Sequence, residues 1–415
     1  MYDQWTLANG LRIVGEKLPH LRSVSVGVWI RVGSMMESLE ENGLSHFMEH
    51  MVFKGTQTRS ARQIAEEMDA VGGQLNAFTS KDCTCFYAKV IDSDLPLAVD
   101  ILSDLTLNAT LDNGELQKER GVILEEIAMV EDTPEDLVHD LLSQAQFGAT
   151  GLGMPILGPA SRIEAYSRQD LANFRASHYR PENVVISLAG NYQLETVKEL
   201  IEKYFGAWQG QGQPEMPKAQ QPSQGVRLAR EKDTEQVHIC LGYPGKGLGS
   251  DDAYPVAVFN NLLGGGMSSR LFQRIREELG MAYSIYTYPG AYPGCGTFNV
   301  YAGTSPKHAQ TVLEQIEIQM KKLLAEGIND KEFQMGKAQL RGAYILGLES
   351  AAGRIQSIGR GELLLQHPPT PEETIAKIDR VEKEDVMRVA QEILAAKPCA
   401  AIVGKQAEKY IQYVG

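Results

Sequence analysis

Residues 45–55, Ser-His-Phe-Met-Glu-His-Met-Val-Phe-Lys-Gly, combine three polar side chains with an apolar background. The apolar residues around His46, Glu49 and His50 are typical of a buried helix. On a helix, residues four apart lie one above the other, about 5–6 Å between Cβ atoms, so both imidazoles can reach one zinc ion. Glu49 lies on the same side of the helix but points too far round to be a further ligand. This position leaves Glu49 free to act as a general base on water.

A catalytic zinc site needs a third protein ligand and an open fourth position. Residues 115–130 have helical periodicity and place Glu119 and Glu126 two turns apart on one face. The neighbouring Glu125 points about 100° away, toward the polar side of that helix. We therefore predict that Glu126 is the third zinc ligand and that Glu119 orients one of the histidines.

Two alternatives remain open from the residues alone. Buried histidine and glutamate side chains can simply hydrogen-bond each other without a metal. Glu119 can also be an exposed carboxylate that pairs with Lys118 or Arg120. The apolar surroundings of residues 45–55 favour the metal site, because charged side chains are rarely buried unless they are paired or bind a metal.

The chain that must position these residues divides into two halves at residues 209–225, a Gln-, Gly- and Pro-rich stretch typical of a linker. Each half contains an alternating strand, then a helix, a glycine and two strands, and it ends with a helix, an apolar strand and a glycine. This order predicts two similar α+β domains, each an antiparallel sheet with helices packed on one face. The predicted domains are 1–208, which holds the zinc site, and 226–415.

The composition excludes several classes of protein. The 415 residues carry a net charge of −13, which argues against a nucleic-acid partner and is compatible with basic or neutral peptide ligands. Five scattered cysteines do not form the even pattern of a secreted disulfide framework, so we expect reduced thiols. No apolar run reaches the roughly 18 residues of a membrane span, and no signal or transit peptide pattern is visible. We therefore expect no membrane partner and a cytoplasmic location.

The motif His46-x-x-Glu49-His50 is the inverted zincin signature. Together with Gly-Gly-Gln-Leu-Asn-Ala-Phe-Thr at 72–79, and with Glu126 lying 76 positions after His50, it makes the chain resemble the M16 metallopeptidases over essentially its whole length. The length resembles the half-size bacterial type and the β subunit of the mitochondrial processing peptidase. The resemblance implies a zinc endopeptidase with one Zn²⁺ per subunit. It also implies a homodimer whose four domains enclose a chamber.

The resemblance also implies residues that bind the peptide substrate. Arg276 and Tyr283 match the family's Arg/Tyr pair, which binds the substrate backbone, helps to stabilise the tetrahedral intermediate and faces the zinc of the partner subunit. Without the resemblance, Arg276 would be interpreted as a solvated helix arginine. An extended peptide is expected to add as a strand to the sheet edge that contains Asn76, Ala77 and Phe78.

Two acidic residues suggest a cleavage preference. Asp136 and Asp140 match positions that, in the processing peptidase, are associated with an arginine near the cut. The alternative is that Asp136 merely complements the N-terminus of a helix that has Thr133 as its N-cap and Pro134 as its first residue.

Two other functions are less well supported by the sequence. A non-catalytic scaffold or partner subunit of the same family is disfavoured because all three ligand positions and the base are filled. The run Gly-Gly-Gly-Met-Ser-Ser at 264–269 lacks both the G-x-G-x-x-G spacing and a P-loop lysine, so we do not predict nucleotide binding.

Overall fold

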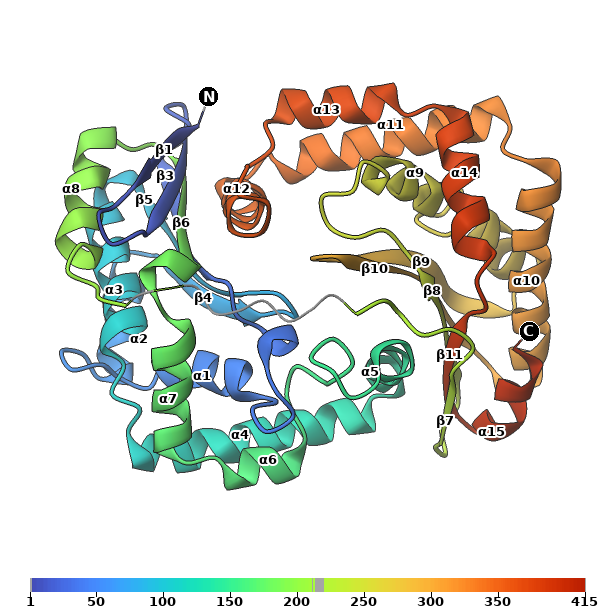
Figure 1. Cartoon of the computed structure of the whole chain (residues 1–415), viewed down its shortest axis with the longest axis horizontal. Helices are drawn as coiled ribbons and strands as arrows, with labels where there is room; N and C mark the ends of the chain where they lie inside the picture. The colour runs from blue at the N-terminus through green and yellow to red at the C-terminus, as the bar shows by residue number, and fades with distance from the viewer. Residues whose placement is uncertain (1, 211, 213–219, 415) are drawn as a thin grey trace. The chain divides into compact units, whose positions relative to one another are not determined.

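The computed structural model describes residues 2–210, 212 and 220–414, and these residues form two compact units (Figure 1). The predicted linker, 209–225, therefore lies partly outside the described residues. The first unit comprises the described residues of three segments, Met1–Ile127, Pro155–Pro217 and Leu346–Thr370. The second unit comprises the described residues of Ala128–Met154, Lys218–Ile345 and Pro371–Gly415. The units differ from the predicted domains because residues 128–154 and 346–370 each pack with the opposite half of the chain.

The first unit is built on a six-stranded sheet of order β1-β2-β6-β3-β5-β4. In that order the strands are Asp3–Thr6, Arg12–Lys17, Val184–Gly190, Ser23–Ile30, Thr84–Ile91 and Gln74–Thr79. Strands β2 and β6 run parallel, and the other neighbours are antiparallel. The sheet is thus mostly, but not wholly, antiparallel. Strand β4 lies at its edge.

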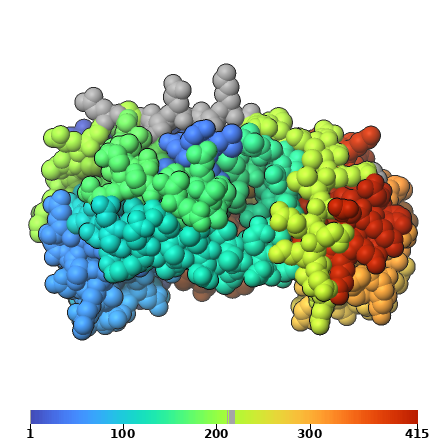
Figure 2. All heavy atoms as spheres, turned by 90° about the horizontal axis from the view of Figure 1, so that it is seen from below, coloured from blue at the N-terminus to red at the C-terminus, as the bar shows by residue number. Residues whose placement is uncertain are grey.

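Helices from the first half of the chain cover one face of this sheet and form the main core with it. They are α1 (Leu44–Val52), α2 (Ala61–Ala70), α3 (Leu95–Asn108), α4 (Asn113–Asp132), α6 (Ala160–Ala165), α7 (Arg168–His178) and α8 (Leu194–Phe205). Helices α4, α6 and α7 form one outer face of the unit, teal and green in Figure 2. Arg120 of α4 donates to the carbonyl of Ile163 in α6 at 3.0 Å.

The opposite face of the first sheet is apolar as well, which the prediction of helices on one face did not anticipate. Trp29, Cys85 and Val185 are buried there against Ile358 and Leu363 of α12 (Ala351–Leu365). Figure 1 shows α3 and α8 on one side of the sheet and α12 on the other. A sheet that is apolar on both faces must be covered on both, and a helix from the second half of the chain does so here.

The second unit repeats this plan with a five-stranded sheet of order β7-β11-β8-β10-β9. The strands are Arg227–Glu231, Cys399–Gly404, Val237–Pro244, Cys295–Thr304 and Ala282–Tyr292, and β7 is parallel to β11. One face packs against α9 (Ala253–Leu263), α10 (Ala309–Glu326), α11 (Asp330–Gly347), α14 (Lys383–Leu394) and α15 (Ala407–Tyr410), and α13 (Pro371–Arg380) contacts α9. The other face packs against α5 (Pro134–Phe147), a helix from the first half. Residues 272–278, predicted to be helical, form a π-helix.

All five cysteines are buried and unpaired, as the sequence predicts. Among the described residues, no helix combines the length and the apolar character that crossing a membrane requires.

Candidate metal centre

In helix α1 the buried apolar residues determine where the polar side chains point. Phe47, Met48, Met51 and Val52 are fully buried in the core of the first unit. The 3.6-residue period then directs the side chains of residues 46, 49 and 50 to the rim of that core, where they are partly buried. The apolar residues of the motif therefore determine the direction of the polar ones.

The structure brings His46, His50 and Glu126 together. The Oε2 atom of Glu126 lies 3.6 Å from Nε2 of His46 and 3.6 Å from Nε2 of His50. One donor atom from each of the three residues lies within 4.8 Å of the other two. Zinc bonds of 2.0–2.2 Å at tetrahedral angles place ligand atoms roughly 3.4 Å apart. Two imidazole nitrogens and a carboxylate oxygen at these separations therefore fit a zinc ion and leave a fourth position open.

The protonation state of His46 also suits a metal. Burial, and to a lesser degree the neighbouring His50, lowers the pKa of His46 to about 4. His46 is thus neutral near pH 7, and only a neutral imidazole has a lone pair to donate to a metal. The two rings lie edge to face, with centroids 4.6 Å apart.

Glu49 lies beside the three ligands without belonging to the group. Its Oε2 accepts a hydrogen bond of 2.5 Å from the hydroxyl of Thr79, at the end of β4. Burial raises the pKa of Glu49, and the Thr79 bond acts in the opposite direction. A partly desolvated carboxylate of raised pKa is suited to take a proton from water near neutral pH. Thr79 was not predicted as a site residue, although it ends the motif at 72–79.

The carboxylate of Glu119 is 7% exposed and bridges two side chains of the α1 segment. Its Oε2 lies 3.1 Å from Nδ1 of His50, and its Oε1 lies 2.7 Å from Nζ of Lys54. The alternative partners point elsewhere, because Lys118 pairs with Glu115 at 2.7 Å and Arg120 donates to backbone carbonyls. A carboxylate on Nδ1 leaves Nε2 of His50 as the metal-binding nitrogen. Lys54 was missed, although its position four residues after His50 is a signal for proximity.

The predicted substrate strand is β4, and it lies at the edge of the first sheet. Among the strands of the described residues it pairs only with β5. Asn76 is exposed, and Ala77 and Phe78 are half-buried. An edge strand presents unpaired backbone groups that can accept another extended chain.

The remaining predicted residues belong to the second unit. Arg276 of the π-helix lies with its guanidinium 4.7 Å from the ring centre of Tyr283, which is 73% exposed on β9. Asp136 and Asp140 both lie on α5, which begins at Pro134 as predicted. The structure thus brings Arg276 and Tyr283 together and places the two aspartates four residues apart on one helix.

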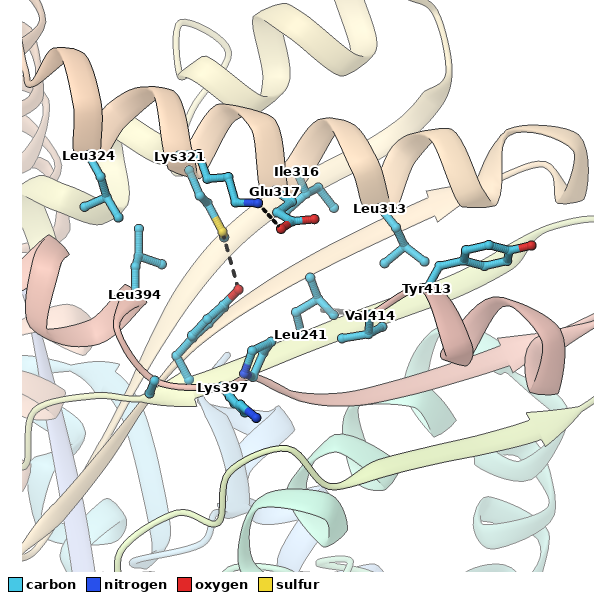
Figure 3. Close-up of a pocket in the computed structure, with 14 residues that line it drawn as sticks. Leu241, Leu313, Ile316, Glu317, Lys321, Leu324, Leu394, Lys397, Tyr413 and Val414 are labelled. Carbon is cyan, nitrogen blue, oxygen red and sulfur yellow. Dashed lines mark hydrogen bonds and ion pairs between the residues drawn. The ribbon is translucent and has the colours of Figure 1, made fainter.

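The second unit also contains an apolar cavity of about 210 Å³, shown in Figure 3. Its lining includes Leu241, Leu313, Ile316, Leu324, Leu394 and Val414. Four of the side chains drawn in this view are paired with each other, since Lys321 pairs with Glu317 at 2.5 Å and Tyr243 donates to the sulfur of Met320 at 3.5 Å. None of the three candidate metal ligands lines this cavity.

Comparison with known proteins identifies the family of this chain. Residues 12–160 match the model of insulinase (peptidase family M16), and residues 165–340 match that of the peptidase M16 inactive domain. The uncharacterized zinc protease YmxG of Bacillus subtilis is 43% identical over 97% of this chain and 98% of its own. An uncharacterized zinc protease of Streptomyces coelicolor is 39% identical over 97% of this chain and 90% of its own.

A solved structure has the same fold. The crystal structure of a protease from Helicobacter pylori superposes with a TM-score of 0.91 at 22% identity, and the match covers 97% of this chain and 99% of that one. With the two domain models and the full-length relatives, the conclusion is direct: this chain belongs to peptidase family M16 and is of the half-size type.

Proposed function

We propose that this protein is a zinc-dependent endopeptidase that cleaves extended peptides or unfolded segments. The observation that carries the proposal is the approach of the Glu126 carboxylate to 3.6 Å from both His46 and His50, with Glu49 beside them. The names of the full-length relatives, all zinc proteases, support it.

In this mechanism His46, His50 and Glu126 would hold one zinc ion, and Glu119 keeps His50 oriented through its Nδ1. A bound zinc ion supplies Lewis acidity, which polarises a carbonyl and lowers the pKa of water toward about 7. Glu49 takes the proton of the attacking water and delivers it to the leaving amine. Thr79 holds the Glu49 carboxylate in place for both transfers.

The substrate adds as a strand along Asn76, Ala77 and Phe78 at the β4 edge. Backbone hydrogen bonds give sequence-tolerant affinity, and side chains that alternate across the strand give selectivity. We further propose a homodimer in which Arg276 and Tyr283 of the partner's second domain donate to the developing oxyanion. The exposed Tyr283 ring and the adjacent guanidinium support this role, and the four domains would then enclose the substrate in a chamber.

Asp136 and Asp140 are proposed to favour an arginine near the cleaved bond. Both carboxylates lie on one helix at a spacing that puts them on one face. The test compares cleavage of an Arg-containing peptide with that of the same peptide carrying citrulline. The D136N/D140N variant should lose the preference for Arg, and an unchanged preference would remove this part of the proposal.

The central experiment measures zinc content, peptide cleavage and mass in solution on the purified protein. We expect zinc to be bound, activity to disappear with a chelator and to return with added zinc. The E49Q variant should keep its zinc while turnover falls by about 10²–10⁴-fold or more. Activity retained in E49Q, after contaminating proteases are removed, would refute the base. A protein that binds no zinc and cleaves nothing would instead support the alternative of a non-catalytic scaffold or partner subunit.

A further inference from the structure

Helix α1, which carries the candidate ligands, has no side-chain cap at its own N-terminus. Its N-cap residue is Gly43, whose backbone has a φ of 98°. A Cβ atom at that position would lie 2.8 Å from the carbonyl oxygen of Leu157 and 3.0 Å from Cα of Gly158. The Ser, Thr, Asp or Asn that usually caps a helix is therefore excluded here by both space and backbone conformation.

Glu37, which lies six residues before the N-cap, supplies the missing cap. Its Oε1 accepts from the backbone N–H of Ser45 at 2.7 Å, and its Oε2 accepts from that of Gly43 at 2.9 Å. The side-chain amide of Asn42 donates to the same Oε2 at 3.0 Å. Glu37 is only 5% exposed. Ser45 is the second residue of α1, and its N–H is one that an N-cap side chain ordinarily satisfies.

The three bonds also define the form of the Glu37 side chain. All three partners are N–H donors, so both oxygens must accept, as they do in a carboxylate. A negative charge at this place also complements the partial positive charge of a helix N-terminus. Burial raises the pKa of Glu37, and the hydrogen bonds from Ser45 and Gly43 oppose that rise.

The Glu37 cap lies one residue away from the first candidate metal ligand. Ser45, which is bonded to Glu37, directly precedes His46, so the carboxylate holds the turn of α1 that directs the first imidazole. The loop that carries the cap is itself held, because Tyr166 donates to the carbonyls of Glu40 and Asn42, each at 2.9 Å. A fixed loop and a two-point bond to the helix start together restrict the rotation of the first turn.

We propose that Glu37 is a positioning residue for the metal centre: by bonding the backbone of Gly43 and Ser45 it sets the orientation in which His46 meets His50 and Glu126. The inference rests on the proposed zinc site. Residues that hold metal ligands in place usually change metal affinity about 10–100-fold when they are replaced. Glu37 acts through the backbone, so we expect the lower end of that range.

The test measures zinc affinity by competition with a chromophoric chelator, at a temperature well below unfolding, for E37Q, E37D and E40Q. E37Q turns one accepting oxygen into an NH₂ donor that faces N–H groups. E37D keeps the charge but shortens the reach, so it cannot span both amides. E40Q removes an exposed carboxylate from the same loop and serves as the control. Unfolding temperatures of the zinc-free variants are measured in parallel.

We expect E37Q and E37D to bind zinc about tenfold more weakly than the unmodified protein, and E40Q to bind it equally well. A folded E37Q or E37D with unmodified affinity would overturn the inference, even if its zinc-free form unfolds at a lower temperature, since the cap would then serve stability only. If E37Q does not fold, the zinc affinity of E37D decides whether the inference holds. Failure of the unmodified protein to bind zinc is a different result, because it refutes the proposed function itself.

Discussion

The two units have the same sheet topology over five strands, but only the first contains the candidate metal ligands. Strands β2, β6, β3, β5 and β4 of the first sheet correspond in order to β7, β11, β8, β10 and β9 of the second, and each sheet has its parallel pair at the same place. In each unit the next long helix after the central strand, α1 or α9, packs into the core. The correspondence confirms the predicted similarity of the two halves.

The corresponding helices of the two units differ at the positions that carry the candidate metal ligands. Helix α1 carries His46, Glu49 and His50 between its buried residues, whereas α9 reads Ala-Tyr-Pro-Val-Ala-Val-Phe-Asn-Asn-Leu-Leu. Likewise, α4 turns Glu126 toward the histidines, whereas on α11 the carboxylate of Glu332 pairs with Arg270 at 2.9 Å. Within the part of the chain that the structure describes, His46, His50 and Glu126 are the one group arranged to hold a metal. A repeated fold thus preserves its core positions, while a few rim residues decide which copy has a site.

The largest effect expected from this comparison is the loss of a ligand from α1. H50Q removes one of three donors, so zinc affinity should fall by more than the roughly 100-fold that residues behind the ligands can cost. Zinc is measured by competition titration and by metal content after dialysis. H20Q, at an exposed histidine, is the matched control and should bind zinc normally. An H50Q protein with unchanged affinity would place the metal elsewhere.

A smaller effect is expected at the carboxylate behind His50. E119Q should weaken zinc binding by about 10–100-fold, because the His50 ring loses the acceptor that fixes it and Lys54 loses its ion pair. E115Q, on the same helix and paired with Lys118, should leave zinc affinity unchanged. Equal affinities for E119Q and E115Q would mean that Glu119 has only a structural role.

Replacing Thr79 should lower kcat without changing zinc affinity. T79V removes the hydroxyl that donates to Glu49, and a hydrogen bond to a charged group contributes about 1.5 kcal/mol, or roughly tenfold in rate. We expect kcat to fall by about that factor while zinc affinity stays constant and T79S retains activity. Steady-state kinetics on a fluorogenic peptide provides the measurement. A kcat for T79V equal to that of the unmodified protein would show that Glu49 needs no such support.

The smallest effect concerns an ion pair of the second unit and depends on pH. The bond from Arg388 lowers the pKa of Asp252 to about 2 from its usual 3.8, with Lys246 adding to the effect. Because the folded value is the lower one, the stabilisation is fully present above pH 3.8 and is lost as the pH falls from there through about 2. D252N should therefore lower stability at pH 7 by less than about 1 kcal/mol.

Denaturant unfolding of the zinc-free protein at pH 7, 4, 3 and 2 tests this effect. The difference between D252N and the unmodified protein should shrink steadily from pH 4 to pH 2, where Asp252 is about half ionised. Zinc affinity at pH 7 should not change, since the pair belongs to the unit without the metal group. A difference as large at pH 2 as at pH 7 would mean that the Asp252 bonds do not depend on its charge.

Much of the candidate site could be predicted because its signals are local. The spacing of His46 and His50 and the apolar residues between them predict a helix with one polar rim, and Glu119 and Glu126 share a face for the same reason. The apolar strand and glycine predicted near the end of each half are found at Val184–Gly190 and Cys399–Gly404. Such features depend on neighbours that lie a few positions away in the chain.

What the sequence by itself determined is therefore the repeated order of strands and helices, the buried thiols and the identity of the residues suited to bind a metal. Only the tertiary structure decided that α5 and α12 each cover the sheet of the opposite half, and that Thr79, Lys54 and Glu37 support Glu49, Glu119 and α1. These contacts join residues far apart in the chain. They depend on which apolar face is still exposed, and which backbone amide still lacks an acceptor, after the other elements have packed. The spacing of residues along the chain does not indicate either of these.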